Sequence, residues 1–273
     1  MNIKKIGIVG LGLIGGSFSY AFYDKNFHIY AYDIDQTTLA KAASTNIFEG
    51  ITDEIDVFLD FPVELIYICL PVIAALDFVK ILGNRKIKLP VTDSLSTKVS
   101  IVEAAKAYHL NFCGGHPIAG GELSGFDKAS KNILKGAKHI LVKSENKLFH
   151  ELKSLHEIID MNVTPMDAYE HDAVFGLISH IPHLIAFNLM DTVLIENSAS
   201  LNYTGAGFKD FTRIAGSDPV MWANIFIDNK INIISFAKNF IKNLESWIEV
   251  IKKDDMTDLT SKIKDVSDKR RVL

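Results

Sequence analysis

Short apolar runs and helical patterns alternate along the first 165 residues of the chain. Six runs rich in β-branched and aromatic residues have the length of buried strands: 3–9, 28–33, 65–70, 90–93, 111–114 and 139–142. Helical spacing occupies several intervals between them: from the glycine cluster to about residue 25, then 35–44, 73–82 and 97–108. Because strands that alternate with helices form parallel βαβ units, the pattern predicts an α/β fold with a doubly wound parallel sheet.

The pattern changes near Pro165. From Asp167 onward strand alternation is almost absent. Three stretches have helical spacing instead: 167–195, 219–253 and 258–271. Pro182 lies inside the first of them, so we expect a bend or an opened turn there. The sequence therefore predicts two domains, an α/β domain over residues 1–165 and an all-helical C-terminal domain over residues 166–273.

Composition narrows the class of protein. Of the 273 residues, 48% are hydrophobic and 23% are charged, which is typical of a soluble globular protein with a sizeable core. The formal net charge of −4 offers no basic surface to a polyanion, so nucleic acid is not an expected partner. No run of about 18 uninterrupted apolar residues exists, so we expect no membrane span and a cytoplasmic location.

A glycine-rich turn follows the first strand and opens the first helix. It consists of Gly10, Leu11, Gly12, Leu13, Ile14 and Gly15. The G-x-G-x-x-G spacing allows a tight turn, close approach of a pyrophosphate to the backbone, and close packing of the helix on the strand. The free amides at the helix N-terminus then face the phosphates. The spacing predicts a dinucleotide site in a Rossmann domain.

An acidic residue stands where the second strand ends. Asp33 follows Gly10 by 23 residues, and a carboxylate there accepts hydrogen bonds from the adenosine ribose and repels a 2′-phosphate. The next residues include no Arg or Lys to hold such a phosphate, so the sequence favours NAD over NADP. The alternative is that Asp33 only caps the helix that starts near Asp35.

Reactive side chains follow several strands, where open α/β sheets bind their ligands. Leu70 and Ser94 end two strands, and we expect them to line the cofactor site. His116 follows the next strand among glycines that leave room for a ligand, and a histidine can take the proton of a hydroxyl that is being oxidised. Ser96 could orient His116 by a hydrogen bond. The alternative for any single histidine is an incidental core or surface residue.

The helical half adds two further candidate segments, 179–183 and 205–222. On a regular helix His180 and His183 share a face, but no acidic or cysteine ligand accompanies them at a usual spacing, so we expect no metal. Arg213 is suited to binding a carboxylate through a two-pronged hydrogen bond. The alternative for Arg213 is a surface salt bridge.

Together these segments resemble the prephenate dehydrogenase family. The matching pieces are VGLGLIGGS, VTDSLSTK, HPIAGGELSG, SHIPH and GFKDFTRIAGSDPVMW, in the order that the family has, up to about residue 228. The combination of HPIAG, SHxPH and FxDxTRIA is specific. The resemblance implies a Rossmann domain followed by a helical dimerisation domain. It also implies the NAD-dependent oxidative decarboxylation of prephenate to 4-hydroxyphenylpyruvate in tyrosine biosynthesis.

The resemblance further implies roles for single residues. His116 corresponds to the catalytic histidine that contacts the ring hydroxyl, and Ser96 corresponds to the serine beside it near the nicotinamide. His183 corresponds to a substrate-binding histidine and Arg213 to the carboxylate-binding arginine. Trp222 corresponds to a residue that lines the pocket.

Two charged residues, Glu122 and Asp210, resemble family residues near the pocket entrance. The sequence departs from the family at Leu95, where glycine is common, and at Gly121, where a bulkier residue is common. Neither departure removes a reactive group.

Three alternatives stay open at this point. The enzyme could prefer arogenate or accept both substrates, since these differ only in an amino or an oxo group on the side chain. Another β-hydroxyacid or imino-acid oxidoreductase would lack the HPIAG and TRIA segments. A non-catalytic NAD sensor would keep the glycines and Asp33 but would not need His116, Ser96 and Arg213.

Overall fold

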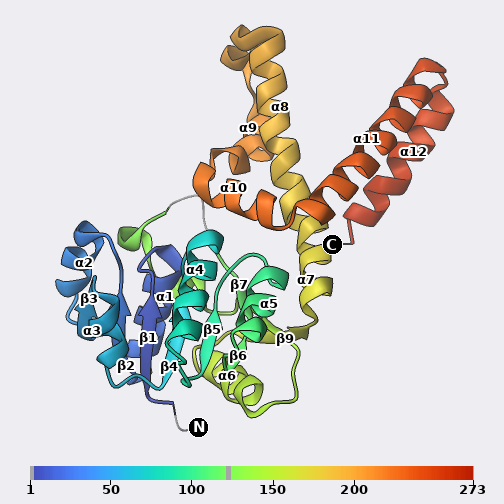
Figure 1. Ribbon diagram of the computed structural model, residues 1–273. Helices are drawn as coiled ribbons and strands as arrows, with labels where there is room; N and C mark the ends of the chain where they lie inside the picture. The colour runs from blue at the N-terminus through green and yellow to red at the C-terminus, as the bar shows by residue number, and fades with distance from the viewer. Residues whose placement is uncertain (1–2, 121–123, 273) are drawn as a thin grey trace.

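The computed structural model describes residues 3–120 and 124–272, and it has a sheet-containing half and a helical half (Figure 1). The first half is built on a six-stranded parallel sheet with the order β3-β2-β1-β4-β5-β6. Its strands are β1 (Lys5–Val9), β2 (His28–Tyr32), β3 (Phe48–Thr52), β4 (Leu65–Ile68), β5 (Val91–Asp93) and β6 (Phe112–Cys113). The expected α/β fold with a doubly wound parallel sheet is confirmed.

Helices cover both faces of this sheet because its central strands are apolar on both sides. In β4, Leu65 and Tyr67 belong to the core on one face, whereas Ile66 and Ile68 belong to the core on the other. The first face is covered by α1 (Leu13–Tyr23), α2 (Gln36–Ala43) and α6 (Lys147–Ile158). The second face is covered by α3 (Ile55–Asp60), α4 (Val72–Asn84) and α5 (Val99–Ala107).

The sequence pattern did not predict three of these elements: β3, α3 and α6. The edge strand β3 has no buried residue among its five, so its sequence FEGIT lacks the continuous apolar run of the central strands. The short helix α3 buries only Phe58. Helix α6 buries Leu148, Phe149, Leu152 and Leu155, a helical spacing that was the available signal for it.

A second, smaller sheet contains β7 (Gly115–Ile118), β8 (Lys138–Val142) and β9 (Asn162–Met166) in that order. Strand β8 is antiparallel to β7 and parallel to β9. The assignment of 139–142 to the large parallel sheet was therefore wrong. The pattern also missed β7, because its sequence Gly-His-Pro-Ile has no apolar run and contains a proline, which sheets tolerate at edge strands such as this one.

The second half of the chain is helical, as expected. Its elements are α7 (Ala168–Phe175), α8 (Ile181–Asn197), α9 (Ala206–Thr212), α10 (Pro219–Asp228), α11 (Lys230–Lys252) and α12 (Met256–Arg270). Helices α7 and α8 are joined by a wide π-type turn over Gly176–His180. An opened turn was expected near Pro182, because proline has no N–H to donate to the preceding turn. The π-type turn is this opening. The boundary after residue 165 stays a prediction, and β9 extends one residue beyond it.

Hydrogen bonds join the helical half to the carboxyl edge of the large sheet. The carboxylate of Asp172 on α7 accepts the backbone N–H of Lys98 at 2.7 Å and that of Val99 at 2.9 Å. On α10, the amide oxygen of Asn224 accepts the backbone N–H of Ile73 at 3.1 Å. Both contacts lie at the ends of parallel strands, where a nucleotide-binding sheet presents its ligand site.

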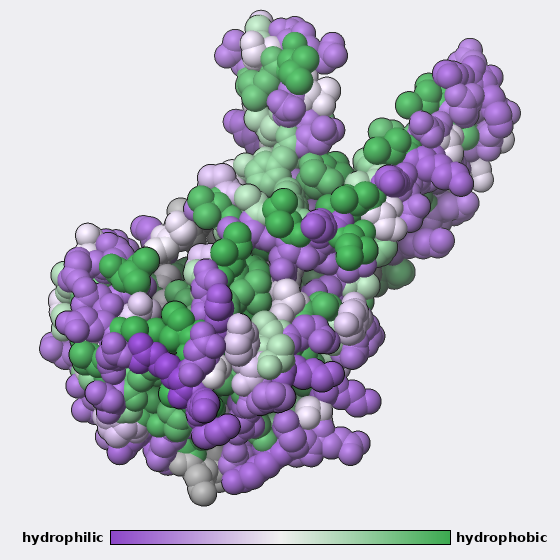
Figure 2. Space-filling view, viewed as in Figure 1, coloured by the Kyte–Doolittle hydropathy of each residue, from purple (hydrophilic) through white to green (hydrophobic). Residues whose placement is uncertain are grey.

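Two helical arms point away from the sheet in different directions (Figure 1). One arm is α8 with α9, and the other is α11 with α12. Figure 2 shows apolar surface on both arms. Exposed large apolar side chains on the helical half include Leu194, Ile195, Phe211, Ile227, Ile231, Ile234, Phe240, Ile241 and Ile248. Exposed apolar side chains gathered on one part of a molecule are typical of a surface that another chain covers.

The helical stretch Ala168–Tyr203 bears on the expectation that no segment spans a membrane. By length and composition alone, this stretch is long and apolar enough to cross one, and 28% of its most apolar window is buried inside the chain. The same exposed apolar surface is what a partner chain would cover.

We expect Gly15→Ala to destabilise the fold strongly, whereas Gly12→Ala should leave it intact. A Cβ on Gly15 would stand 1.9 Å from the carbonyl oxygen of Gly10, which is backbone and cannot rotate away. A Cβ on Gly12 would meet nothing within 4 Å. Overpacking of this kind costs about 3 kcal/mol, whereas a substitution without a clash stays within about 0.5 kcal/mol. Urea unfolding of both variants measures the difference, and equal losses would contradict this geometry.

Candidate functional site

A cavity of about 380 Å³ lies where the carboxyl edge of the large sheet meets α10. The glycine-rich turn contributes Gly12, Leu13 and Ile14 to its wall, and strand ends contribute Leu70, Ser94 and Ser96. His116 of β7 and the α10 residues Met221 and Ile225 also line it. The cavity therefore brings the expected cofactor turn and the expected catalytic histidine to one space, between the two halves of the chain.

The glycine-rich turn has the geometry of a phosphate cradle. Gly10 has a φ of +92°, and a Cβ there would stand 2.7 Å from the carbonyl oxygen of Cys69, so only glycine fits. Gly12 is the N-cap of α1 and provides no side-chain cap, so the first amides of the helix are available to a ligand. The open space at Gly12 is where a pyrophosphate could approach the backbone.

Asp33 braces this turn from the end of β2. Its carboxylate accepts the backbone N–H of Leu11 at 2.6 Å and that of Asp35 at 2.9 Å. The cap of α2 is Asp35 instead, which accepts the N–H groups of Thr37 and Thr38. The alternative that Asp33 serves only as a helix cap is therefore wrong, since it links the strand end to the glycine-rich turn.

His116 lies on β7 and has a second histidine as its hydrogen-bond partner. Its Nδ1 is 2.8 Å from Nε2 of His171 on α7, and Nδ1 of His171 is 2.8 Å from Oδ1 of Asp172. Ser96, which the sequence suggested as the orienting group, lines the same cavity. Sequence reasoning missed His171, and the adjacent His-Asp pair at the start of a helix was the available signal.

Burial determines the charge state of these rings. Burial first, and then the neighbouring His171 and Lys98, lower the pKa of His116 well below its usual range. Burial also lowers the pKa of His171 to about 2. Both imidazoles are neutral near neutral pH, so each carries one ring proton and one lone pair.

Lys98 is buried without solvent contact beside the site. Its ammonium is ion-paired with Asp93 and donates to the carbonyl oxygen of Gly115 at 2.6 Å. Asp93 also accepts the backbone N–H of Gly115 at 2.9 Å and that of Leu95 at 2.9 Å. Burial raises the pKa of Asp93 and lowers that of Lys98, and these bonds offset that cost. The pair fixes the residue that precedes His116.

His183 and Trp222 form a stacked pair on α8 and α10. Their ring centroids are 3.5 Å apart with an interplanar angle of 22°, and Nδ1 of His183 donates to the carbonyl oxygen of Ser179 at 2.9 Å. The indole Nε1 of Trp222 is buried with no hydrogen-bond partner among the described residues. His180 meets the same indole edge-on, with ring centroids 6.0 Å apart, and its Nδ1 is 3.1 Å from Nδ2 of Asn229. The two histidines therefore contact one tryptophan but have different hydrogen-bond partners.

Four expected residues of the helical half are not part of the cavity wall: His183, Asp210, Arg213 and Trp222. Asp210 on α9 and Arg213 at the start of the turn Arg213–Gly216 are exposed on the single chain. That turn leads directly to Ser217 and Asp218, which line the cavity. Glu122 lies outside the described residues. The roles expected for all these side chains stay predictions.

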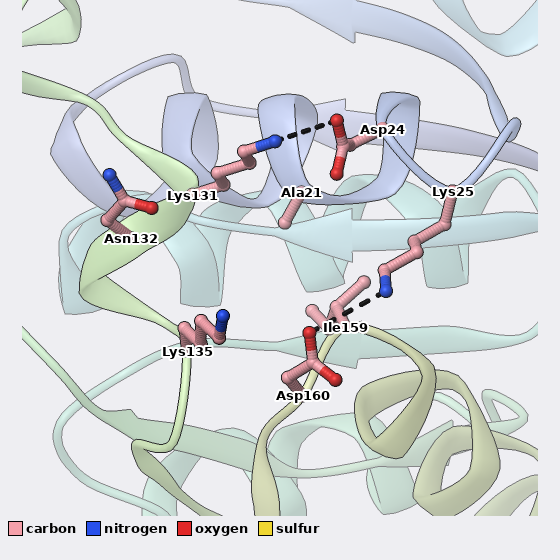
Figure 3. Close-up of a pocket in the computed structure, with 8 residues that line it drawn as sticks. All are labelled: Ala21, Asp24, Lys25, Lys131, Asn132, Lys135, Ile159 and Asp160. Atoms are coloured by element: carbon pink, nitrogen blue, oxygen red, sulfur yellow. Dashed lines mark hydrogen bonds and ion pairs between the residues drawn. The ribbon is translucent and has the colours of Figure 1, made fainter.

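A second, smaller pocket of about 120 Å³ has a different character (Figure 3). Lys131 donates to Asp24 at 2.7 Å, and Lys25 is 3.6 Å from Asp160, near the C-terminal ends of α1 and α6. Cations there are stabilised by the helix dipoles. This pocket lies at the opposite end of α1 from Gly12 and holds surface ion pairs.

The fold and the cavity define a nucleotide-binding dehydrogenase with a helical second domain. Residues 23–163 match the family model described as "Prephenate dehydrogenase, nucleotide-binding domain". Residues 167–265 match the model described as "Prephenate dehydrogenase, dimerization domain". The chain belongs to the prephenate dehydrogenase family, which confirms the resemblance read from its motifs.

Similar proteins cover nearly the whole chain. A prephenate dehydrogenase of Bacillus subtilis is 32% identical, over 99% of this chain and 76% of its own. A cyclohexadienyl dehydrogenase of Zymomonas mobilis is 28% identical, over 92% and 90%. The crystal structure of prephenate dehydrogenase from Aquifex aeolicus, in complex with hydroxyphenyl propionate and NAD⁺, is 34% identical with a TM-score of 0.93, over 99% of this chain and 98% of that one.

We expect the protein to lose stability as the pH falls below about 6.5, the pKa of an unfolded histidine. Burial lowers the pKa of His156 to about 4 and that of His171 to about 2. Both stay neutral in the folded state while the unfolded chain takes up protons, so stability is complete above that pH and declines below it. At about pH 5 each histidine costs about 2 kcal/mol, from 1.36 kcal/mol per pH unit.

Urea unfolding at about pH 7.5 and about pH 5 measures this loss. His156→Phe removes one titrating group and should reduce the acid loss. His150→Asn is the matched control, because His150 is exposed on the same helix, and it should keep the wild-type pH dependence. Equal stability at both pH values would contradict the assignment of neutral buried histidines.

Proposed function

We propose that this chain is an NAD-dependent prephenate dehydrogenase, which converts prephenate to 4-hydroxyphenylpyruvate by oxidative decarboxylation in tyrosine biosynthesis. The observation that carries the proposal is the single cavity lined by both Gly12 and His116. A dinucleotide held at the glycine-rich turn would extend along the sheet edge toward Ser96, beside a proton acceptor. The Aquifex relative was solved with ligands of this kind, hydroxyphenyl propionate and NAD⁺.

The residues around the glycine-rich turn fit NAD. Gly12 leaves the space that a pyrophosphate needs. Asp33 is held by two backbone amides, and its carboxylate keeps lone pairs that can accept from ribose hydroxyls while its charge opposes a 2′-phosphate. Leu70 and Ser94 line the cavity beyond the turn. When bound there, NAD supplies the hydride acceptor.

His116 is proposed as the general base. His116 is half-buried, and the desolvation of its ring favours the neutral form, so the ring can accept the proton of the substrate's ring hydroxyl as hydride leaves the same carbon. Loss of CO₂ from the ring then produces an aromatic product and makes the reaction effectively irreversible. Ser96 lines the same cavity and would contact the hydroxyl or the nicotinamide.

The helical half is proposed to bind the rest of the substrate. Arg213 would hold a carboxylate, since a guanidinium binds one in a two-pronged contact. His183 would meet other substrate oxygens, and so would the indole N–H of Trp222, which has no partner within residues 3–120 and 124–272. Glu122 and Asp210 stay candidates for charged residues at the entrance.

Arogenate has specific support as an alternative or additional substrate. The Zymomonas relative is a cyclohexadienyl dehydrogenase, so arogenate or dual specificity is the alternative. Arogenate differs from prephenate only on the side chain, away from the carbon that is oxidised. A non-catalytic NAD sensor is less favoured, because it would not need a neutral histidine in the wall of the same cavity as the glycine-rich turn.

We also propose a cytoplasmic homodimer formed through the helical half. The support is the exposed apolar surface of α8, α10 and α11, which a second copy would cover. The family model that matches residues 167–265 is described as a dimerization domain. The same contact would cover the apolar helical stretch Ala168–Tyr203.

We expect purified protein to reduce NAD with prephenate and to release one 4-hydroxyphenylpyruvate and one CO₂ for each NADH. Parallel assays with NADP should give a kcat/KM lower by about tenfold or more, about 1.4 kcal/mol, because of Asp33. Assays with arogenate in place of prephenate decide between the two substrates. Absence of turnover with every pairing of substrate and nucleotide would contradict the proposal.

His116→Asn is the matched variant for that assay. Loss of a general base typically lowers kcat by about 10²- to 10⁴-fold, with little effect on ground-state binding. NAD affinity should change little, because the expected phosphate contacts are made by the glycine-rich turn and not by His116. A wild-type kcat in this variant would remove His116 from the chemistry.

Light scattering at micromolar concentration tests the dimer. We expect twice the chain mass of 30.4 kDa. A particle of one chain mass, or one that requires detergent to stay in solution, would contradict the proposed interface.

A further inference from the structure

The hydrogen bonds behind His116 begin at two donors that cannot reverse. The backbone N–H groups of Lys98 and Val99 point at the Asp172 carboxylate, at 2.7 Å and 2.9 Å. A backbone amide only donates, so each Asp172 oxygen accepts one of these bonds, and the ionised carboxylate that they stabilise has no proton to donate. Asp172 is therefore fixed as an acceptor for any further group that contacts it.

The next group in the chain is His171, which is buried. Its Nδ1 lies 2.8 Å from Oδ1 of Asp172, so this nitrogen must carry the proton. A neutral imidazole has one protonated nitrogen, which leaves Nε2 of His171 as an acceptor. Burial lowers the pKa of His171 to about 2, so the ring stays neutral near neutral pH.

The tautomer of His171 determines the tautomer of His116. Its Nδ1 lies 2.8 Å from Nε2 of His171, and because that nitrogen is an acceptor, Nδ1 of His116 must carry the proton. Nε2 of His116 then has a free lone pair. His116 lines the cavity, and Nε2 is the ring nitrogen left for a ligand, because Nδ1 is engaged with His171.

Both rings are also held in orientation by packing. Phe175, one turn along α7, lies 4.5 Å from the His171 ring centroid and 5.0 Å from that of His116. Rotation of either ring would break a hydrogen bond inside a buried environment, which is costly. The structure thus holds one ring arrangement, with one direction of donation along the whole chain.

We propose that His171, anchored by Asp172, is a positioning residue that fixes His116 as the Nδ1-protonated tautomer and presents the Nε2 lone pair to the substrate hydroxyl. The inference rests on the proposed function for its catalytic meaning, since only a base needs that lone pair. The opposite tautomer would place an N–H in the cavity, which could donate to a hydroxyl oxygen but could not accept its proton. Because His171 belongs to α7, the helical half sets the tautomer of a base carried by the other half.

Nitrogen-15 NMR of the histidine rings tests the tautomer without any assay of activity. Two-bond correlations in the intact ¹⁵N-histidine-labelled protein, near neutral pH, identify which ring nitrogen carries the proton. The signals of His116 are those lost in His116→Asn. We expect a protonated Nδ1 and an unprotonated Nε2. A protonated Nε2 on His116 would overturn the inference, whatever the enzyme turns over.

Two variants of His171 separate polarity from packing. His171→Phe keeps a ring against Phe175 but removes the acceptor. His171→Gln loses the ring but can accept from His116 through its amide oxygen and donate to Asp172 through its amide nitrogen. With prephenate and NAD we expect His171→Phe to lower kcat by about 10- to 100-fold and His171→Gln by less than about fivefold, with KM within about twofold in both.

His156→Phe is the control, since it also removes a buried histidine hydrogen bond, to Tyr67 at 2.9 Å, but does not touch His116. It should keep the wild-type kcat. A kcat in His171→Phe that equals or exceeds that of His171→Gln would show that the ring only packs, and would overturn the positioning role. If wild type does not turn over prephenate, the proposed function fails and the NMR result alone decides the tautomer.

Discussion

The buried ion pair between Lys98 and Asp93 is the interaction on which the rest of the site depends. Two opposite charges without solvent contact are stable only when hydrogen bonds satisfy them, and removal of one partner from such a pair typically costs about 3–5 kcal/mol. Here the Asp93 carboxylate forms an ion pair with the ammonium, and the carbonyl oxygen of Gly115 accepts a further N–H of Lys98 at 2.6 Å. The end of β5 is thereby tied to the start of β7, directly before His116.

The same residue connects the two halves of the chain through its backbone. The N–H groups of Lys98 and Val99 bind Asp172 on α7, while the Lys98 side chain reaches the opposite way to Asp93. Docking of α7 therefore brings His171 to the back of His116. Helix α10 closes the front of the cavity with Met221 and Ile225. The cavity wall is complete only where the sheet and the helical half meet.

The sequence could predict the parts of the site whose chemistry is local. The glycine-rich turn is one such part, because spacing over six residues determines where a Cβ is tolerated. His116 was recognisable from its glycine neighbours, although it lies within β7 of a separate sheet and not at the end of a parallel strand. Asp33 was recognisable from its position at a strand end, although its bond to the Leu11 amide was not.

The missed features depend on contacts between residues far apart in the chain. His171 meets His116 across 55 positions, and Asp172 meets Lys98 across 74. No periodicity encodes such pairs, and the buried Lys98 looks like an ordinary surface lysine in the segment VTDSLSTK. The small sheet was missed because its edge strand β7, which pairs with β8, has the sequence Gly-His-Pro-Ile and therefore contains no apolar run. The packing around the edge strand, not its own composition, stabilises it.

Hydrogen exchange at the backbone amides of Lys98 and Val99 tests most directly whether this junction holds the two halves as one folded unit. Both amides bond to a carboxylate of the other half, so they can exchange only when α7 leaves the sheet. We expect them to exchange with the free energy of global unfolding, as slowly as the amides of the central strand β1. Exchange through a local opening of much lower free energy, insensitive to denaturant, would contradict the account, because the helical half would then undock while the sheet stays folded.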